Sequence, residues 1–340
     1  MSAEQLRHAI RRLASGASLS ADETADAFDV VMRGDATPAQ IGALLMALRV
    51  KGETAEEVAG GARALRHAMV RLPASDPDAL VDTCGTGGGV VRTFNISTAA
   101  ALLASGAGVR IAKHGNRSFT TKCGSADVLE ALGVRIEMPV DAMRETLERA
   151  GIVFMFAPLM HPAMRHVGPV RGEIAVPTIM NILGPLANPA SAGRQVLGVA
   201  EEARLPVLAG ALAALGSVHA LVVHGQPGLD EISPLGVTRV LEVCRGTVRE
   251  WTIDAKEYGL HAADAVELAG ATREENADII VRVLRNELKG GARAAVVLNA
   301  AAALYVGGKA PEYEAALQLA EEALTAGAGI AALEQLRGVC

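Results

Sequence analysis

Apolar residues recur at helical spacing in the first 71 residues of the chain. Two clear sets are Leu6, Ile10 and Leu13, and Ile41, Leu44, Leu45 and Leu48. Ser20 and Thr37 stand before the second and third helical runs, and residues of this type commonly begin helices. The pattern predicts four helices and no strand, followed by a proline-marked linker after Leu72.

Beyond this linker, short apolar β-like runs alternate with Ala- and Leu-rich helical runs. The main runs are 80–81, 96–107, 109–112, 128–132, 152–156, 196–199, 205–215 and 220–223, with closing helices expected at 291–305 and 312–326. Such alternation is typical of an α/β fold. A Pro- and Gly-rich stretch at 169–189 interrupts it. We therefore expect an α/β domain over 78–340 and a small helical domain over 1–72, which a segment at about 168–190 rejoins.

Composition narrows the functional classes. The 340 residues are 50% hydrophobic and 3% aromatic, so the core must consist mainly of aliphatic side chains. Charged residues interrupt every early apolar run, which argues against a signal peptide, and no stretch is apolar enough to span a bilayer. A net charge of −6 without a long basic run argues against nucleic-acid binding. Four scattered cysteines without a CxxC pair indicate reduced thiols in a cytoplasm.

A glycine-rich segment, Asp82-Thr-Cys-Gly-Thr-Gly-Gly-Gly89, lies between a predicted strand and a helical run that opens at Asn95. Glycines let the backbone approach a ligand closely, and N–H groups at a helix start attract anions. The segment lacks the Gly-Lys-Ser/Thr of a Walker A loop and is not a GxGxxG fingerprint. It indicates a phosphate-bearing ligand, and a flexible turn is the alternative.

The segment Lys113-His-Gly-Asn-Arg-Ser118 follows the predicted strand that ends at Ala112. Ligands of open α/β sheets bind at the carboxyl ends of strands, and the two cations in this segment, Lys113 and Arg117, suit charge-assisted contacts to phosphate. The alternative is a solvated polar loop. Asp127 follows shortly and is expected to cap the next helix.

Two further groups of polar residues suggest a metal site and a site for the carboxylate of a ligand. Asp230 and Glu231 are adjacent in a predicted loop, and such hard oxygen donors suit Mg²⁺ held jointly with substrate phosphates, although adjacent acids are also common on surfaces. Arg165 and Arg171 follow the predicted strand 152–156, and an arginine can clamp a planar carboxylate through two hydrogen bonds. The alternative for these two arginines is a role as ordinary surface residues.

Several segments together resemble the anthranilate phosphoribosyltransferase family in order and spacing. They are GTGG (85–88), TFNIST (93–98), KHGNRS (113–118), GSADVLEALG (124–133), FAPLMHPAMRHVGPVR (156–171), NILGPLANP (181–189) and DEIS (230–233). The resemblance covers nearly the whole chain and is weakest before residue 40 and after residue 260. It implies transfer of the phosphoribosyl group of phosphoribosyl pyrophosphate to the amine of anthranilate, with release of pyrophosphate, in tryptophan biosynthesis.

The same resemblance implies a fold, a cofactor and a set of site residues. The family has a small helical domain and a larger α/β domain of the nucleoside-phosphorylase type, requires Mg²⁺ and forms a homodimer through the helical domains. The phosphoribosyl pyrophosphate site is expected at Gly85, Gly88, Thr93, Asn95, Ser97, Thr98, Lys113 and Ser125, with Lys113 also catalytic. Mg²⁺ is expected at Ser97, Asp230 and Glu231, and anthranilate at Gly85, Asn116 and Arg171.

One position departs from the family pattern, and two rival functions remain. The family usually has Asp-Gly after GTGG, whereas this chain has Gly89-Val90, so the resemblance supplies no acidic contact there. A pyrimidine nucleoside phosphorylase-like enzyme would share the architecture, but KHGNR together with DEIS favours the transferase. A non-catalytic nucleic-acid-binding relative would need a basic surface, which the net charge argues against.

Overall fold

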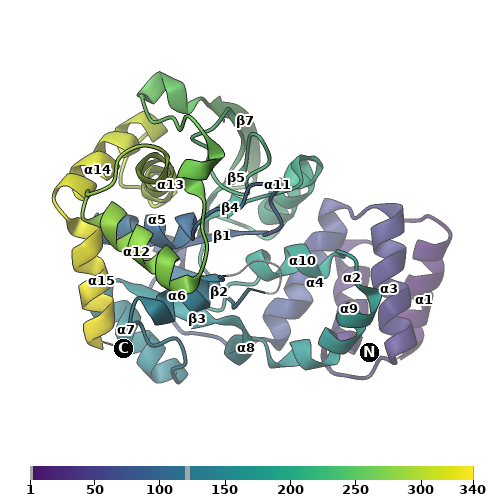
Figure 1. The fold of residues 1–340 in the computed structure, drawn as a ribbon. Coiled ribbons are helices and arrows are strands. Elements are labelled where there is room, and N and C mark those ends of the chain that lie inside the picture. Colours follow the sequence, from purple (N-terminus) through teal and green to yellow (C-terminus); the bar gives the residue numbers. More distant parts are fainter. Residues whose placement is uncertain (1–2, 119–122, 340) are drawn as a thin grey trace.

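The computed structural model describes residues 3–118 and 123–339, and Figure 1 shows a helical part beside a larger part built around a sheet. The first four helices are α1 (Ala3–Ala14), α2 (Ala21–Met32), α3 (Pro38–Lys51) and α4 (Ala55–Ala68). Ser20 and Thr37 cap α2 and α3, because each hydroxyl accepts a hydrogen bond from a backbone N–H of the first turn. The four helices predicted for this region are confirmed.

A seven-stranded sheet lies at the centre of the part of the chain that the structure describes, in the order β3-β2-β1-β4-β5-β6-β7. The strands are β1 (Val81–Gly85), β2 (Ile111–Gly115), β3 (Ile152–Phe156), β4 (Arg194–Gly198), β5 (His219–Gly225), β6 (Thr238–Cys244) and β7 (Thr247–Ile253). The first five in this order are parallel, and β6 and β7 add an antiparallel extension. The parallel strands therefore bring their carboxyl ends to one edge.

Helices connect and cover the strands. They are α5 (Ile96–Gly106), α6 (Ser125–Ala131), α7 (Val140–Ala150), α8 (Ala157–Met160), α9 (Gly168–Ile174), α10 (Met180–Leu183), α11 (Leu205–Ala214), α12 (Arg273–Leu284), α13 (Gly291–Val306), α14 (Tyr313–Thr325) and α15 (Ala328–Val339). Short 3₁₀ helices lie at Pro77–Ala79, Pro162–His166, Gly184–Leu186, Glu202–Arg204, Ala255–Tyr258 and Ala265–Leu268. The segment after β3 returns to the helical part, where α9 contacts α3 and α10 contacts α4.

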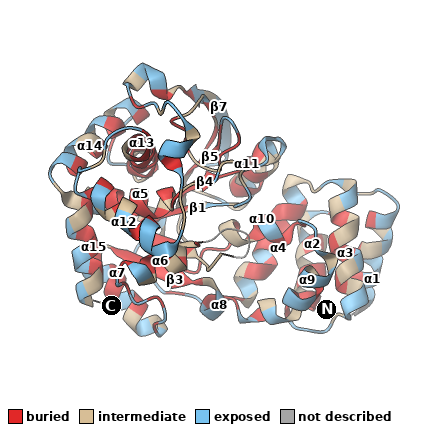
Figure 2. Cartoon of the chain, in the orientation of Figure 1, coloured by how far each residue is buried: buried red, intermediate tan, exposed pale blue. Residues whose placement is uncertain are grey.

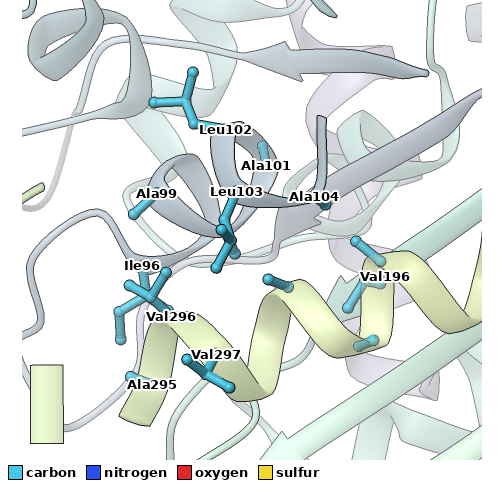
Figure 3. Close-up of a cluster of buried hydrophobic side chains, with 14 of the residues drawn as sticks. Ile96, Ala99, Ala101, Leu102, Leu103, Ala104, Val196, Ala295, Val296 and Val297 are labelled. Carbon is cyan, nitrogen blue, oxygen red and sulfur yellow. The ribbon is translucent and has the colours of Figure 1, made fainter. Parts of the chain in front are cut away.

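One face of the sheet is covered by α5 and α13, both rich in alanine. Figure 3 shows side chains from these helices and from β4 in one cluster, including Leu103, Val196 and Val296. Val196 and Leu197 point to opposite faces, as neighbouring strand residues do, and Leu197 joins a different cluster on the α11 side. Small side chains let these helices lie close to the sheet, so the low aromatic content is compatible with a closely packed core.

The core of the helical part continues into the α/β part. Buried side chains of α1 to α4 form one continuous cluster with α11 and with the sheet face that carries Leu197, Val222 and Val243. Gly210 of α11 lies so close to α4 that an added Cβ would be 2.8 Å from the Ala55 Cβ. Figure 2 shows buried residues in the helices of both parts. The two parts are therefore joined by packing as well as by the chain connections.

The predicted α/β class is confirmed, but several details are not. The predicted strand end at Ala112 is wrong, because β2 continues to Gly115 with the Lys113 and His114 side chains buried against polar partners. The sequence interpretation also missed the hairpin of β6 and β7 and the helices α7, α12 and α15. Among the described residues, no helix is both long and apolar enough to cross a membrane.

Candidate active site

The glycine-rich segment forms the turn after β1 and contacts Asp230. Gly87 and Gly88 have φ angles of 69° and 84°, which favour glycine, and the Gly87 N–H donates to Asp230 Oδ2 at 2.9 Å. A Cβ on Gly85 would be 2.5 Å from the same carboxylate oxygen, and one on Gly198 would be 1.7 Å from the Asp230 carbonyl oxygen. The sequence therefore brings the predicted phosphate loop against the predicted metal ligand, 143 positions away.

The start of α5 meets the other acidic residue. The Ser97 N–H donates to Glu231 Oε1 at 3.0 Å, and Lys113 Nζ donates to Ser97 Oγ at 3.2 Å and to the Thr83 carbonyl oxygen at 2.5 Å. Lys113 is on β2, Ser97 on α5 and Glu231 after β5. Three segments that the sequence suggested separately thus meet at the carboxyl edge of the sheet.

Burial disfavours charge in this cluster. Burial raises the pKa of Glu231 to about 8, with repulsion by Asp230 adding to it, and burial also raises the pKa of Asp230. Burial lowers the pKa of Lys113, although attraction to Asp82 opposes that shift. Asp82 is 1% exposed, and burial raises its pKa to about 6 despite a hydrogen bond from Asn188. The carboxylates of Asp230 and Glu231 at this edge are therefore poorly compensated by protein groups.

The donor set fits Mg²⁺ bound together with phosphate oxygens. Asp230 and Glu231 supply carboxylate oxygens and Ser97 a hydroxyl, all hard ligands of the kind Mg²⁺ prefers. Within residues 3–118 and 123–339, no three Cys, His, Asp or Glu side chains gather closely enough to hold a metal ion alone. Mg²⁺ commonly uses one or two carboxylates and takes its other ligands from water and substrate, and this arrangement provides that number.

Asn95 has its side chain held by neighbouring elements. Its Oδ1 accepts hydrogen bonds from Asn276 Nδ2 at 2.9 Å and from the Cys123 thiol at 3.3 Å, and its Nδ2 donates to the Cys123 carbonyl oxygen. Thr98, another predicted contact, is 1% exposed, and its hydroxyl has no partner among the described residues. Thr93 precedes Asn95 in the loop and is half-buried. The loop before α5 therefore ends at Asn95, whose side chain is held by hydrogen bonds from other elements.

The segment after β2 corrects one expectation. Arg117, expected as a second cation for phosphate, instead donates to Asp127 Oδ1 at 3.0 Å and to both carboxylate oxygens of Glu130. Asp127 accepts from the Gly124 N–H at 2.8 Å, so it takes part in the cap, but as the third residue of α6 and not as the residue before a helix that begins near Val128. Ser125 begins α6 and donates to the Asn116 carbonyl oxygen at 3.4 Å. Arg117 therefore anchors this loop. Lys113 is the cation of the segment 113–118 that lies in the polar cluster with Ser97.

A separate pocket of about 450 Å³ opens between the helical part and the sheet edge. Its lining includes Asn116, Arg165, Arg171, His114 and His161, together with Pro and Met side chains. Arg171 is half-buried on α9 with no hydrogen-bond or ion-pair partner among the described residues, and burial lowers its pKa. Arg165 also has no such partner among the described residues, but it is exposed. An apolar pocket with a half-buried, uncompensated guanidinium suits a flat organic acid.

Two buried histidines form the inner wall of this pocket. His114 and His161 face each other with Nε2 atoms 3.2 Å apart, and burial lowers their pKa values to about 3 and about 4. Both are therefore neutral at pH 7, and one ring N–H donates to the other ring. His114 follows Lys113 on β2, so the two side chains point to opposite faces of the strand. The strand thus serves both the polar cluster and the pocket.

Family models match the chain in two pieces. The helical bundle domain of a glycosyl transferase family matches residues 7–69, and the a/b domain of a glycosyl transferase family matches residues 77–330. The anthranilate phosphoribosyltransferase of Rubrobacter xylanophilus is 50% identical over 97% of this chain and 96% of its own length. That of Anaeromyxobacter dehalogenans is 49% identical over 97% of both chains.

The chain belongs to the anthranilate phosphoribosyltransferase family. A crystal structure of anthranilate phosphoribosyltransferase from Thermus thermophilus is similar to it, with a TM-score of 0.91, 42% identity and 97% of this chain and 98% of that chain covered. The Saccharomyces cerevisiae anthranilate phosphoribosyltransferase in complex with PRPP and Mg gives a TM-score of 0.88 at 28% identity, covering 99% and 98%. The predicted family and the helical-plus-α/β fold class are confirmed.

The residues predicted for the anthranilate phosphoribosyltransferase site fall into two groups in space. One group, at the carboxyl edge of the sheet, contains Gly85, Gly88, Thr93, Asn95, Ser97, Thr98, Lys113, Ser125, Asp230 and Glu231. The other group, Asn116 and Arg171, lines the pocket, whereas Gly85, also predicted to contact anthranilate, is not part of its lining. A hydrogen bond from Ser125 to Asn116 links the two groups. Sequence reasoning missed Asn276 and Asn299, because a single asparagine far away in the chain carries no motif. Asn188 lies in the quoted segment 181–189, but its hydrogen bond to Asp82 was not predicted.

Proposed function

We propose that this chain transfers the phosphoribosyl group of phosphoribosyl pyrophosphate to the amine of anthranilate, giving N-(5-phosphoribosyl)anthranilate and pyrophosphate in tryptophan biosynthesis. The observation that carries the proposal is the pairing of an acidic and glycine-rich edge with an adjoining apolar pocket that contains an uncompensated arginine. The first suits a magnesium-bound pyrophosphate, and the second suits an aromatic carboxylate.

The donor is proposed to lie along the carboxyl edge of the sheet. Its phosphates would meet the Gly85 and Gly88 backbone, the α5 start at Asn95, Ser97 and Thr98, and the side chains of Thr93, Lys113 and Ser125. Asp230, Glu231 and Ser97 would hold Mg²⁺, which neutralises pyrophosphate charge and makes it a better leaving group. Lys113 is the catalytic residue, since its ammonium lies beside Ser97 and stabilises charge that develops on the leaving oxygen.

The acceptor is proposed to occupy the pocket with its carboxylate on Arg171. Asn116 Oδ1 already accepts a hydrogen bond from the Arg117 N–H at 2.7 Å, which leaves its amide NH₂ to face anthranilate. Gly85 would contact anthranilate from the carboxyl edge of the sheet. A carboxylate held in this way keeps the neighbouring amine free to attack.

The chemistry requires little proton transfer. The bond from ribose C1 to the pyrophosphate oxygen breaks with its electron pair leaving on oxygen, and the amine lone pair forms the new bond to C1. The resulting ammonium then gives one proton to solvent. An arylamine is weakly basic, so its lone pair is available at neutral pH without a general base.

The oligomeric state and the location in the cell are also proposed from the resemblance to the family. We propose a cytoplasmic homodimer that associates through the helical domain, made of residues 1–72 and about 168–190, with 78–340 binding the donor. A pyrimidine nucleoside phosphorylase-like activity is the rival enzyme, and nucleic-acid binding without catalysis is the rival binding function. An assay that follows loss of anthranilate fluorescence with phosphoribosyl pyrophosphate and Mg²⁺ separates the three, because neither rival consumes anthranilate.

Arg171 gives the most specific test of acceptor binding. Removal of a charged hydrogen bond costs about 1.5–3 kcal/mol, so Arg171→Ala is expected to raise the KM for anthranilate roughly tenfold to a hundredfold. Arg171→Lys is expected to recover only part of the loss, because an ammonium lacks the two-pronged geometry. The KM for phosphoribosyl pyrophosphate should barely change.

Arg165 provides a matched control. It lines the same pocket but is exposed, so Arg165→Ala is expected to change the KM for anthranilate less than Arg171→Ala does. A larger defect for phosphoribosyl pyrophosphate than for anthranilate in Arg171→Ala would move this arginine to the donor site.

A further inference from the structure

A buried asparagine interrupts the apolar surface of α13. Asn299 is 3% exposed and lies among alanine, valine and leucine side chains that belong to the main core. Its Oδ1 accepts from the Ile232 N–H at 2.9 Å, and its Nδ2 donates to the carbonyl oxygens of Ile232 and Ala295, each at 2.9 Å. A polar side chain in this position is stable because its hydrogen bonds are satisfied.

The orientation of this amide follows from its partners. The N–H of Ile232 requires an acceptor, and the two carbonyl oxygens require a donor, so the reversed amide would oppose like groups on both sides. Asn299 therefore binds both polar groups of one residue, as a neighbouring strand would. Ile232 is the residue directly after Glu231.

The acidic pair is consequently fixed from both ends. On its N-terminal side, Asp230 accepts from Gly87, and its carbonyl oxygen lies where a side chain on Gly198 would be. On its C-terminal side, Ile232 is held by Asn299. Glu231 lies between these two anchors with its carboxylate on the Ser97 N–H. Its backbone direction, and hence the direction of its carboxylate, depends on both.

We propose that Asn299 is a positioning residue for the metal site, which directs Asp230 and Glu231 toward the bound donor without touching it. The inference rests on the proposed function, because it assumes that these acids hold Mg²⁺. Only a side chain of this length with both a donor and an acceptor makes the observed contacts, since aspartate lacks the donor and serine is too short. Groups behind metal ligands commonly change metal affinity about tenfold to a hundredfold.

The test measures metal binding directly. Asn299→Leu keeps the number and branching of the side-chain heavy atoms but removes the amide, so Ile232 loses both hydrogen bonds to this side chain. Mn²⁺ titrations of the full chain in the presence of phosphoribosyl pyrophosphate, followed by the electron paramagnetic resonance signal of free Mn²⁺, are expected to show affinity weakened about tenfold. In a Glu231→Gln background, the same substitution is expected to add little further loss, because Asn299 acts through Glu231.

Tyr313→Phe is the matched control for general loosening of α13. The Tyr313 hydroxyl is buried and donates to the Leu298 carbonyl oxygen at 3.0 Å, one residue from Asn299, but it makes no contact with the acidic pair. Tyr313→Phe is expected to lower Tm without changing the affinity for Mn²⁺. If Asn299→Leu also lowers Tm and leaves the affinity for Mn²⁺ at the wild-type value, Asn299 has only a structural role and the proposal is wrong.

A measurement on the unmodified chain makes the proposal testable even if the variants fail to fold. Hydrogen exchange of the Ile232 amide, resolved by NMR, is expected to be slow without metal, because this N–H is bound to Asn299. Rapid exchange there would overturn the proposal. Failure of the proposed function gives a different result, since wild-type protein would then leave anthranilate unconsumed while these binding and exchange measurements remain interpretable.

Discussion

Glu242 lies on β6 beside the first half of β5, and Glu231 lies in the loop after β5. The two carboxylates have opposite electrostatic surroundings. Glu242 on β6 accepts hydrogen bonds from His219, Arg249, Trp251 and Tyr305, at 2.7–2.9 Å. Burial favours a higher pKa for Glu242, but the hydrogen bonds from His219, Arg249 and Tyr305 outweigh it and lower that pKa to about 2. By contrast, the pKa of Glu231 is raised to about 8, with Ser97 as its hydrogen-bond donor in the part of the chain that the structure describes.

The difference separates a structural carboxylate from a binding carboxylate. A buried charge that protein donors satisfy fully can stabilise a fold, and the Glu242 cluster joins β5, β6 and β7 to α13 in this way. A carboxylate that the protein leaves poorly satisfied gains more from an external cation. The antiparallel extension thus satisfies its buried carboxylate with protein groups, whereas we expect ligands to satisfy the carboxylates at the carboxyl edge of the sheet.

The largest expected effect comes from neutralising the acids at the carboxyl edge. Asp230→Asn combined with Glu231→Gln is expected to reduce the magnesium-dependent rate on the order of a thousandfold, because metal charge stabilisation contributes several kcal/mol. The free energy of unfolding is expected to change by less than about 1 kcal/mol, since neither acid belongs to a satisfied cluster. Steady-state rates at varied Mg²⁺ and urea unfolding test both parts. Wild-type turnover with an unchanged metal response would rule out these residues as ligands.

For Glu242→Gln we expect the reverse, which is lower stability with unchanged activity. Loss of charge-assisted hydrogen bonds should cost about 2 kcal/mol of stability at pH 7, while the transferase KM values stay unchanged. Since the folded pKa lies below the usual 4.5, Glu242 stabilises the fold above pH 4.5, and this contribution is lost as the pH falls from 4.5 toward 2. The stability of the variant should therefore depend less on pH in that window, as measured by thermal unfolding.

Glu250→Gln is the control for this second variant. Glu250 is on β7, pairs with Arg239 and is exposed, so its neutralisation is expected to change stability little. If both variants unfold at the same temperature, the Glu242 cluster does not contribute more than an ordinary surface ion pair.

The smallest effect is expected from adding a carboxylate to the carboxyl edge. A Cβ on Gly89 would be 3.4 Å from Asp230 Oδ1 and 3.0 Å from the Gly228 carbonyl oxygen, a tight position that does not require a positive φ. Gly89→Asp is expected to shift the Mg²⁺ concentration for half-maximal rate by up to about fivefold, since a partly exposed charge pair contributes at most about 1 kcal/mol. Superimposable titrations would place residue 89 away from the metal.

Local signals predicted the elements that depend on local chemistry. The caps at Ser20 and Thr37 fixed the starts of two helices, and the glycines at 85–89 indicated a turn that approaches a ligand. The hairpin of β6 and β7 was missed, because Thr247–Ile253 is mostly exposed and lacks a strong apolar alternation. Its register depends on pairing with β5, which the local sequence does not encode.

Side-chain contacts between separate elements were the least predictable part of the site. Arg117 has the composition of a phosphate contact but is neutralised by Asp127 and Glu130, and only the folded chain brings Glu130 to it. Asn299 is 67 positions from Ile232, and Asn276 is 181 positions from Asn95. A residue that acts by holding another backbone carries no spacing rule, so it becomes visible only from its partners.

The shared core of the helical part also determines how the protein unfolds. Since the core of α1 to α4 continues through α4 to α11 and the sheet, separation of the two parts would expose apolar surface to water. Neither part therefore loses its structure at little cost to the other, and heat should melt them together. We expect calorimetry to record a single endotherm with equal calorimetric and van't Hoff enthalpies in place of two transitions.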